Sequence, residues 1–155
     1  MQCTSLAFDF QRACFNVEDA KPQDEASLFF WDWLLKQVKL SPQHAALHKV
    51  YQEDAVAIYY DLDGDGDDEI IGTHLSSAVN GDGETLLYIL KNDKNGDYRE
   101  ITGEEIYFDY HCPVCILMKK TDGYRNIQIF KSADSSTVVY AFNKAKGQYY
   151  KKTNK

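Results

Sequence analysis

The chain changes from one hydrophobic period to another near residue 55. Before that point, apolar side chains recur three or four positions apart, at Leu28, Trp31, Leu34, Leu35 and Val38. This spacing predicts an amphipathic helix, which Asp24 or Ser27 can cap. Ser41-Pro42 is expected to end it and to open a second short helix that extends to residue 50, because proline suits a first helical turn.

After residue 55, short apolar and aromatic runs alternate with polar positions and are separated by turns rich in Gly, Asn and Asp. Such runs, with a turn roughly every 8–12 residues, are typical of antiparallel strands that follow one another along a sheet. Asn80-Gly81-Asp82-Gly83 predicts a hairpin turn. The predicted strands are 55–60, 69–75, 85–91, 98–101, 106–110, 115–119, 125–130, 137–142 and 148–151.

A chain of 155 residues suits a single domain, and its 44% hydrophobic content is enough for a real core. The 11 Tyr and 8 Phe favour strands. We therefore expect an α+β fold in which N-terminal helices pack on an antiparallel β meander. Within the domain 1–155, residues 1–22 are expected to be a loosely structured lead-in, 23–50 helical and 55–151 the meander.

The net charge of −7 limits the kinds of partner. Nucleic acid is not expected, because no basic patch offsets the repulsion from phosphates. A cation or a basic protein is expected instead. The sequence also contains no apolar run of the roughly 18 residues that a membrane span requires.

The cysteines and the start of the chain bear on its compartment. Met1-Gln2-Cys3 favours a processed mature chain with an added Met, and therefore a periplasmic or secreted protein whose signal peptide has been removed. Four cysteines permit two disulfides with three possible pairings. Cys112-Pro113-Val114-Cys115 can be interpreted as a redox dithiol, but a strand rather than a helix is predicted to follow it. A structural disulfide or plain thiols is the preferred interpretation.

The strongest chemical signal is the segment from Asp61 to Glu69, between two predicted strands. Side-chain oxygen donors stand at alternate positions and Gly64 and Gly66 permit a tight curl, so the oxygens can point at one centre. Calcium takes six to eight such oxygens in flexible geometry, whereas magnesium is stricter. The alternative is an acidic turn without an ion. The expected metal ligands are Asp61, Asp63, Asp65, Asp67 and Glu69.

The segment from Tyr60 to Ile71 resembles the FG-GAP or VCBS type of calcium loop found in β-propeller blades. It is not an EF-hand, because Gly72 stands where the bidentate Glu would be and strands flank the loop. The resemblance implies a calcium cofactor and propeller-blade-like strand–loop–strand units. The sequence of the loop departs from the family pattern at Glu69, where Asp is usual. Residues 122–127 repeat part of the pattern and suggest a degenerate second unit that has lost its metal ligands.

No catalytic constellation is evident in the sequence, which contains no P-loop, no Rossmann glycine pattern and no nucleophile elbow. We therefore expect a binding protein and not an enzyme. In size, charge and exported character, the chain loosely resembles two groups of proteins. These are the immunity proteins that neutralise type VI secretion amidases and the periplasmic lysozyme inhibitors. The resemblance implies a basic cell-wall hydrolase as partner, with a small polar loop inserted in its active site. The alternative is a calcium-dependent extracellular adhesion or ligand-binding module.

Two loops are candidates for the inserted element. The first is the segment containing Ser132, Asp134, Ser135 and Ser136, and the second begins at Ser76 and Ser77. The alternative interpretation of each loop is an ordinary hairpin connection with no role in binding.

Overall fold

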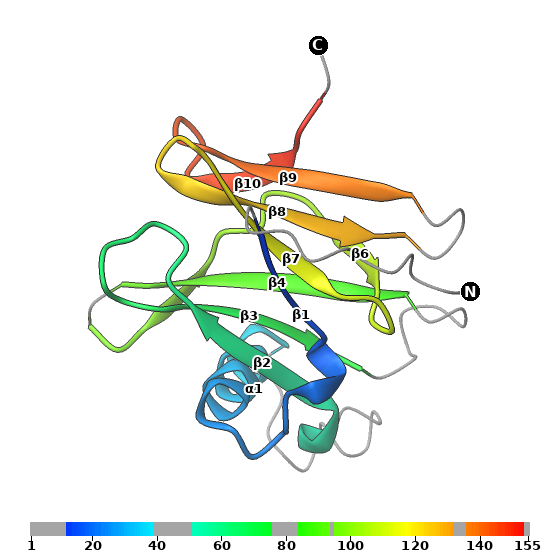
Figure 1. Cartoon of the computed structure of the whole chain (residues 1–155). Coiled ribbons are helices and arrows are strands. Elements are labelled where there is room, and N and C mark those ends of the chain that lie inside the picture. The colour runs from blue at the N-terminus through cyan, green and yellow to red at the C-terminus, as the bar shows by residue number, and fades with distance from the viewer. Residues whose placement is uncertain (1–11, 39–50, 76–83, 94, 132–135, 154–155) are drawn as a thin grey trace.

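The computed structural model describes residues 12–38, 51–75, 84–93, 95–131 and 136–153 of the chain. The predicted second helix and the predicted turn at Asn80–Gly83 lie outside these residues, as do Ser76, Ser77, Ser132, Asp134 and Ser135. Within the described part, the fold consists of two antiparallel sheets and one helix, in agreement with the α+β class (Figure 1).

Sheet A has the strand order β1-β7-β8-β9-β10. Four of its strands follow one another as a meander, whereas β1 comes from the N-terminal part of the chain and pairs with β7. The prediction of a loosely structured lead-in is therefore wrong for these residues. The bounds are β1 Arg12–Phe15, β7 Val114–Thr121, β8 Tyr124–Phe130, β9 Thr137–Asn143 and β10 Gln148–Lys151.

Sheet B has the order β2-β3-β4-β5, and β6 pairs with the first half of β4. Each strand lies close to its predicted range, because the Gly- and Asp-rich turns fix where the extended runs end. The bounds are β2 Ala55–Tyr60, β3 Glu69–His74, β4 Glu84–Asn92, β5 Tyr98–Glu100 and β6 Ile106–Asp109.

The helix α1 (Glu25–Val38) covers the face of sheet B that is turned away from sheet A (Figure 1). Ser27 is not its cap: the residue is buried inside the helix, where its hydroxyl oxygen accepts the N–H of Ala57 at 2.9 Å. At Gly72 a Cβ would lie 2.9 Å from the Phe30 ring. Only glycine therefore lets helix and sheet approach this closely.

Sheet B is buried on both faces, which explains its continuous apolar runs. Ala57, Ile70 and Leu90 belong to the core beneath α1, whereas their neighbours Val56, Ile71 and Ile89 belong to the core between the sheets. Side chains alternate between the two faces of a strand, so the side chains of adjacent residues pack in different cores. The resulting order of layers is sheet A, sheet B and α1. The propeller-blade likeness remains a prediction.

Candidate metal centre

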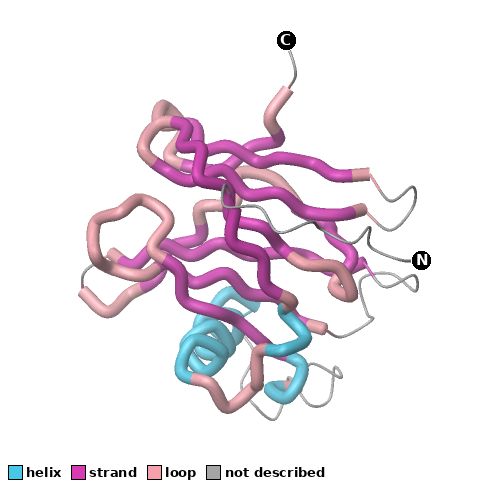
Figure 2. The backbone as a smooth tube through the Cα atoms, in the orientation of Figure 1, coloured by secondary structure: helices cyan, strands magenta, loops and turns pink. Residues whose placement is uncertain are grey.

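The acidic loop, residues 61–68, joins β2 to β3 as a wide curl at one end of the molecule (Figure 2). Asp61 organises the start of the curl. Its Oδ1 accepts the N–H of Gly64 at 2.8 Å, and its Oδ2 accepts the N–H of Gly66 at 3.1 Å. Both glycines have positive φ, 77° and 92°, which other residues adopt only at a cost. The loop is therefore shaped by its own side chains.

The following aspartates continue the same arrangement. Oδ1 of Asp63 accepts the N–H of Asp65 at 3.2 Å, and Oδ1 of Asp65 accepts the N–H of Asp67 at 2.8 Å. These bonds leave lone pairs on each carboxylate. One oxygen from each of Asp61, Asp63 and Asp65 lies within 4.8 Å of the other two. Three converging carboxylates are hard oxygen donors, so the cluster could hold a metal ion.

Glu69, the first residue of β3, faces the inside of the curl and is fully buried. Its Oε2 accepts the N–H of Leu62 at 2.7 Å, which fixes the end of the loop to its beginning. Burial, together with the charge of Asp63, raises the pKa of Glu69 to about 7. This carboxylate therefore supports the loop and does not belong to the three-aspartate cluster.

Lys91, near the end of β4, supplies a positive charge to the same loop. Its Nζ lies 2.6 Å from Oδ2 of Asp63, 3.2 Å from Oδ2 of Asp65 and 3.2 Å from Oε1 of Glu69. Burial alone would lower the pKa of Lys91, but these carboxylates raise it above its ordinary value. The loop thus contains an ammonium group from β4, bound by three of the five predicted metal ligands.

The predicted ligand set is only partly brought together. Asp61, Asp63 and Asp65 converge, Asp67 contributes its backbone N–H to the curl, and Glu69 binds Leu62 and Lys91. Sequence reasoning missed Lys91. The signal that could have revealed it is strand register: Ile70 pairs with Leu90, so Lys91 stands beside Glu69 in the next position of the ladder.

The turn between β7 and β8 lies against the acidic loop. The N–H of Arg125 donates to the carbonyl of Leu62 at 2.9 Å, and Leu62 is fully buried in the core between the sheets. The φ angles of Asp122 and Gly123, 52° and 89°, are those of a tight hairpin turn. The two segments that share a sequence pattern, 65–70 and 122–127, therefore belong to neighbouring parts of the fold.

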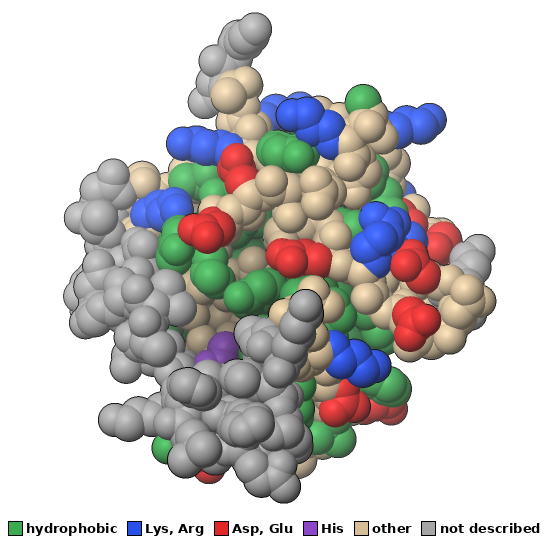
Figure 3. All heavy atoms as spheres, turned by 180° about the vertical axis from the view of Figure 1, so that it is seen from behind, with side chains coloured by type: hydrophobic (Ala, Val, Ile, Leu, Met, Phe, Trp, Pro, Cys, Tyr) green, Lys and Arg blue, Asp and Glu red, His purple; other side chains and the backbone are tan. Residues whose placement is uncertain are grey.

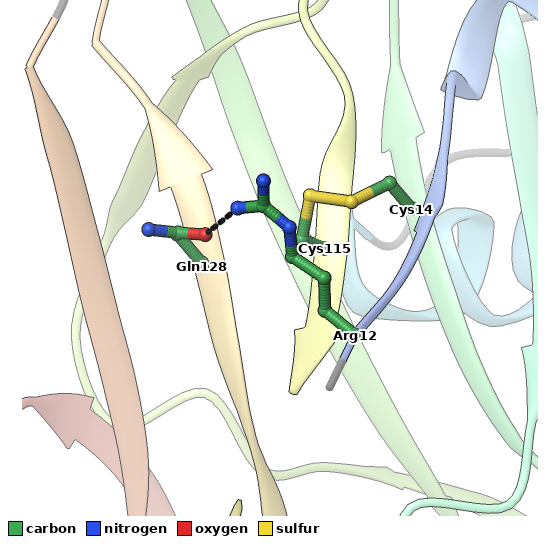
Figure 4. Close-up of a disulfide and its surroundings, with 4 residues drawn as sticks. All are labelled: Arg12, Cys14, Cys115 and Gln128. Atoms are coloured by element: carbon green, nitrogen blue, oxygen red, sulfur yellow. Dashed lines mark hydrogen bonds between the residues drawn. A yellow bond between two sulfur atoms is a disulfide. The ribbon is translucent and has the colours of Figure 1, made fainter. Parts of the chain in front are cut away.

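The three cysteines in the described part of the chain are in disulfides. Cys14 of β1 is bonded to Cys115 of β7, directly opposite in the strand ladder and 101 positions away in sequence (Figure 4). Cys112 is also disulfide-bonded. Since Cys115 pairs with Cys14, the interpretation of Cys112 and Cys115 as a redox dithiol is wrong. Structural disulfides fit an oxidising compartment. Within the described residues, no helix has the length and apolar character needed to cross a membrane.

No family model matches the chain, and neither a curated protein nor a solved structure is detectably similar to it.

Proposed function

We propose that this chain is an exported, non-enzymatic binding protein that inhibits a cell-wall hydrolase, in the manner of immunity proteins against type VI secretion amidases. It acts in the periplasm and inserts a loop in the active site of its partner. The observation that best supports the proposal is the common location of the strand ends that carry the two candidate loops.

These strand ends are His74 and Glu84 for the first loop and Phe130 and Thr137 for the second. In Figure 1 the ends of β3 and β8 and the starts of β4 and β9 lie on the right, whereas the connection between β2 and β3 lies on the left. Two connections that leave one end of a rigid scaffold can contact the same partner surface. Loops on a rigid scaffold are also where binding residues concentrate in proteins. Ser136, the described end of the second loop, is exposed.

Charge and covalent structure agree with this role. A net charge of −7 attracts a basic hydrolase and raises the association rate. The Cys14–Cys115 disulfide and the Lys91 contacts hold the scaffold together, so the strands that carry the candidate loops are fixed before binding. A preorganised inhibitor loses less entropy on association than a flexible one.

The test is a binding and inhibition assay with purified periplasmic and secreted amidases. A one-to-one complex and loss of hydrolase activity are expected. Replacing 132–136 with a Gly-Ser linker should abolish inhibition. The matched control replaces the β9–β10 turn, Lys144–Gly147, at the opposite end of the molecule, and should retain it. Equal effects of the two replacements, or the absence of binding to any such hydrolase, would contradict the proposal.

A calcium-dependent ligand-binding module is the second candidate, favoured by the converging oxygens of Asp61, Asp63 and Asp65. Calcium suits this donor set because it accepts several carboxylate oxygens in flexible geometry, with affinities of about 10⁻⁴–10⁻³ M in extracellular modules. An ion there would stiffen the corner between β2 and β3. Lys91 opposes it through its charge, so affinity at the weak end of this range is expected.

Thermal unfolding with added calcium, added magnesium or EDTA tests this candidate. Calcium is expected to raise the Tm, and Asp63→Asn is expected to remove the effect. Asp68→Asn, an exposed neighbour outside the cluster, is the control and should leave the calcium effect intact. A Tm that does not respond to either ion would exclude the calcium site without bearing on the inhibitor assay.

A further inference from the structure

Asn126 of β8 is a buried polar residue without a partner. The residue is 1% exposed, and neither its side-chain oxygen nor its side-chain nitrogen has a hydrogen-bond partner. Leaving such a group unpaired costs about 1–3 kcal/mol, so native proteins rarely do it without a reason. A functional reason is a ligand that pairs with the amide when it binds.

The amide lies on the face of sheet A that is turned away from the core between the sheets. The adjacent Ile127 points into that core, and side chains alternate along a strand. Asn126 lines a groove of about 440 Å³ on this face. Leu117 and Val139 form apolar parts of its wall, and Thr137 contributes a hydroxyl group. This volume falls within the range of about 300–1,000 Å³ that is usual for small-ligand sites.

Positive charge gathers at the rim of this groove. Lys119, Lys151 and Lys152 line it. Lys119 contacts the side chain of Lys152 and lowers the pKa of that ammonium, through the contact and through its positive charge. Within the described part of the chain, no carboxylate forms an ion pair with Lys119 or Lys152. Figure 3, the view from behind, shows Lys and Arg side chains gathered at the end from which the C-terminus projects.

We propose that the Asn126 groove binds a carboxylate that has an amide group next to it, the chemistry shared by N-acyl amino acids and peptide carboxy-termini. The ammonium groups of Lys119 and Lys152 pair with the carboxylate. The Asn126 side chain offers one acceptor and two donors, and an amide complements both kinds of group. Leu117 and Val139 contact a small apolar side chain. The groove is separate from the acidic loop and adjoins the second candidate loop at Ser136. The proposal does not require inhibition of a hydrolase.

The ligand chemistry can be tested by NMR titration of the whole chain, with the Asn126 side-chain NH₂ signals as the reporter. The probes are N-acetylalanine, acetyl-Ala-Ala-Ala, N-acetylalanine amide and inorganic phosphate. Both free acids are expected to shift these signals with saturation, and the amide and phosphate are not. Tighter binding of the tripeptide would identify a peptide carboxy-terminus as the ligand, and equal binding an N-acyl amino acid. Equal shifts with phosphate would mean a general anion patch and would overturn the proposal.

Variants separate charge from amide recognition. The double variant Lys119→Ala/Lys152→Ala is expected to weaken N-acetylalanine binding by about tenfold or more, as loss of a charged contact does. The control Lys144→Ala/Lys146→Ala removes the same charge at the exposed β9–β10 turn and should change affinity less than about twofold. Asn126→Leu should abolish binding without lowering the Tm, because the amide makes no bond within the protein. A large fall in Tm, or unchanged affinity, would contradict the proposal.

Discussion

The ammonium nitrogen of Lys91 lies 2.6 Å from Oδ2 of Asp63, although the two residues are 28 positions apart in sequence. This contact ties the acidic loop to β4, a strand two positions away from β2 in sheet B. It also means that the loop already holds one positive charge. Any metal ion that enters the cluster must bind beside that ammonium group or displace it.

Lys91→Met is expected to destabilise the protein by about 3 kcal/mol in EDTA, because it leaves the buried Glu69 without its cation. Urea unfolding measures this loss. Calcium should stabilise the variant more than the wild type, since the competing ammonium has been removed. Lys120→Met is the control, because that exposed lysine makes no ion pair within the described residues. It should change stability by less than about 0.5 kcal/mol. Equal losses in the two variants would show that Lys91 has no special role.

Glu69→Gln tests the elevated pKa of the buried carboxyl. Burial raises the pKa of Glu69 from 4.5 to about 7, so folding favours its protonated form. This contribution to stability is complete below about pH 4.5, where the carboxyl is protonated in both the folded and the unfolded chain. It is lost as the pH rises through about 7, because the buried carboxyl must then ionise in the folded protein. Relative to Glu69→Gln, the wild type should lose up to about 3 kcal/mol across that window.

The measurement is urea unfolding in EDTA at several pH values across the window, and the quantity compared is the slope of unfolding free energy against pH. Asp68→Asn, a substitution of the exposed neighbouring carboxylate, should keep the wild-type slope. Parallel curves for the wild type and Glu69→Gln would contradict the assigned pKa.

Gly72→Ala tests the close packing of α1 on sheet B. The new Cβ would meet the Phe30 ring at 2.9 Å and the Ala57 Cβ at 3.0 Å, and neither neighbour is a flexible chain end. Overpacking of this kind costs about 1–3 kcal/mol. A double-mutant cycle with Phe30→Leu gives the control, because the smaller side chain should relieve part of the clash. Additive effects of the two substitutions would show that the contact is not the cause.

The strands of sheet B and the β7–β10 meander could be predicted because local signals determine them. The turn residues fix strand ends, as at Asp122 and Gly123, and apolar runs fix the strands between them. The division into two sheets could not be predicted. Val56 and Ala57 are adjacent and both buried. An apolar run of this kind has the same hydrophobic pattern in sequence whether its second face packs on a helix or on another sheet.

The parts that sequence reasoning missed depend on long-range contacts. β1 has no hydrophobic alternation of its own, and its pairing with β7 spans most of the chain. In the acidic loop, the local spacing correctly indicated converging aspartates. The role of Lys91 depends instead on the register between β3 and β4, which the spacing within the loop does not contain. The groove at Asn126 draws residues from β7, β8 and β9 in the same way.

The disulfide that attaches β1 leads to the last prediction. Cys14–Cys115 joins positions 101 apart in sequence. β1 also pairs with β7, and Arg12 Nη1 donates to Gln128 Oε1 at 3.1 Å (Figure 4). Cross-linking residues this far apart in sequence stabilises a protein by about 2–5 kcal/mol, mainly by restricting the unfolded chain.

Cys14→Ser/Cys115→Ser should therefore lower the free energy of unfolding by about 2–5 kcal/mol in urea under non-reducing conditions. Hydrogen exchange should accelerate at β1 and remain slow in β8 and β9, because an edge strand opens more easily than the centre of a sheet. Arg12→Gln is the control, since it removes the part-buried bond to Gln128 without breaking the cross-link, and it should cost about 1 kcal/mol. If exchange at β1 stays slow in the double variant, strand pairing and not the disulfide holds β1 in the sheet.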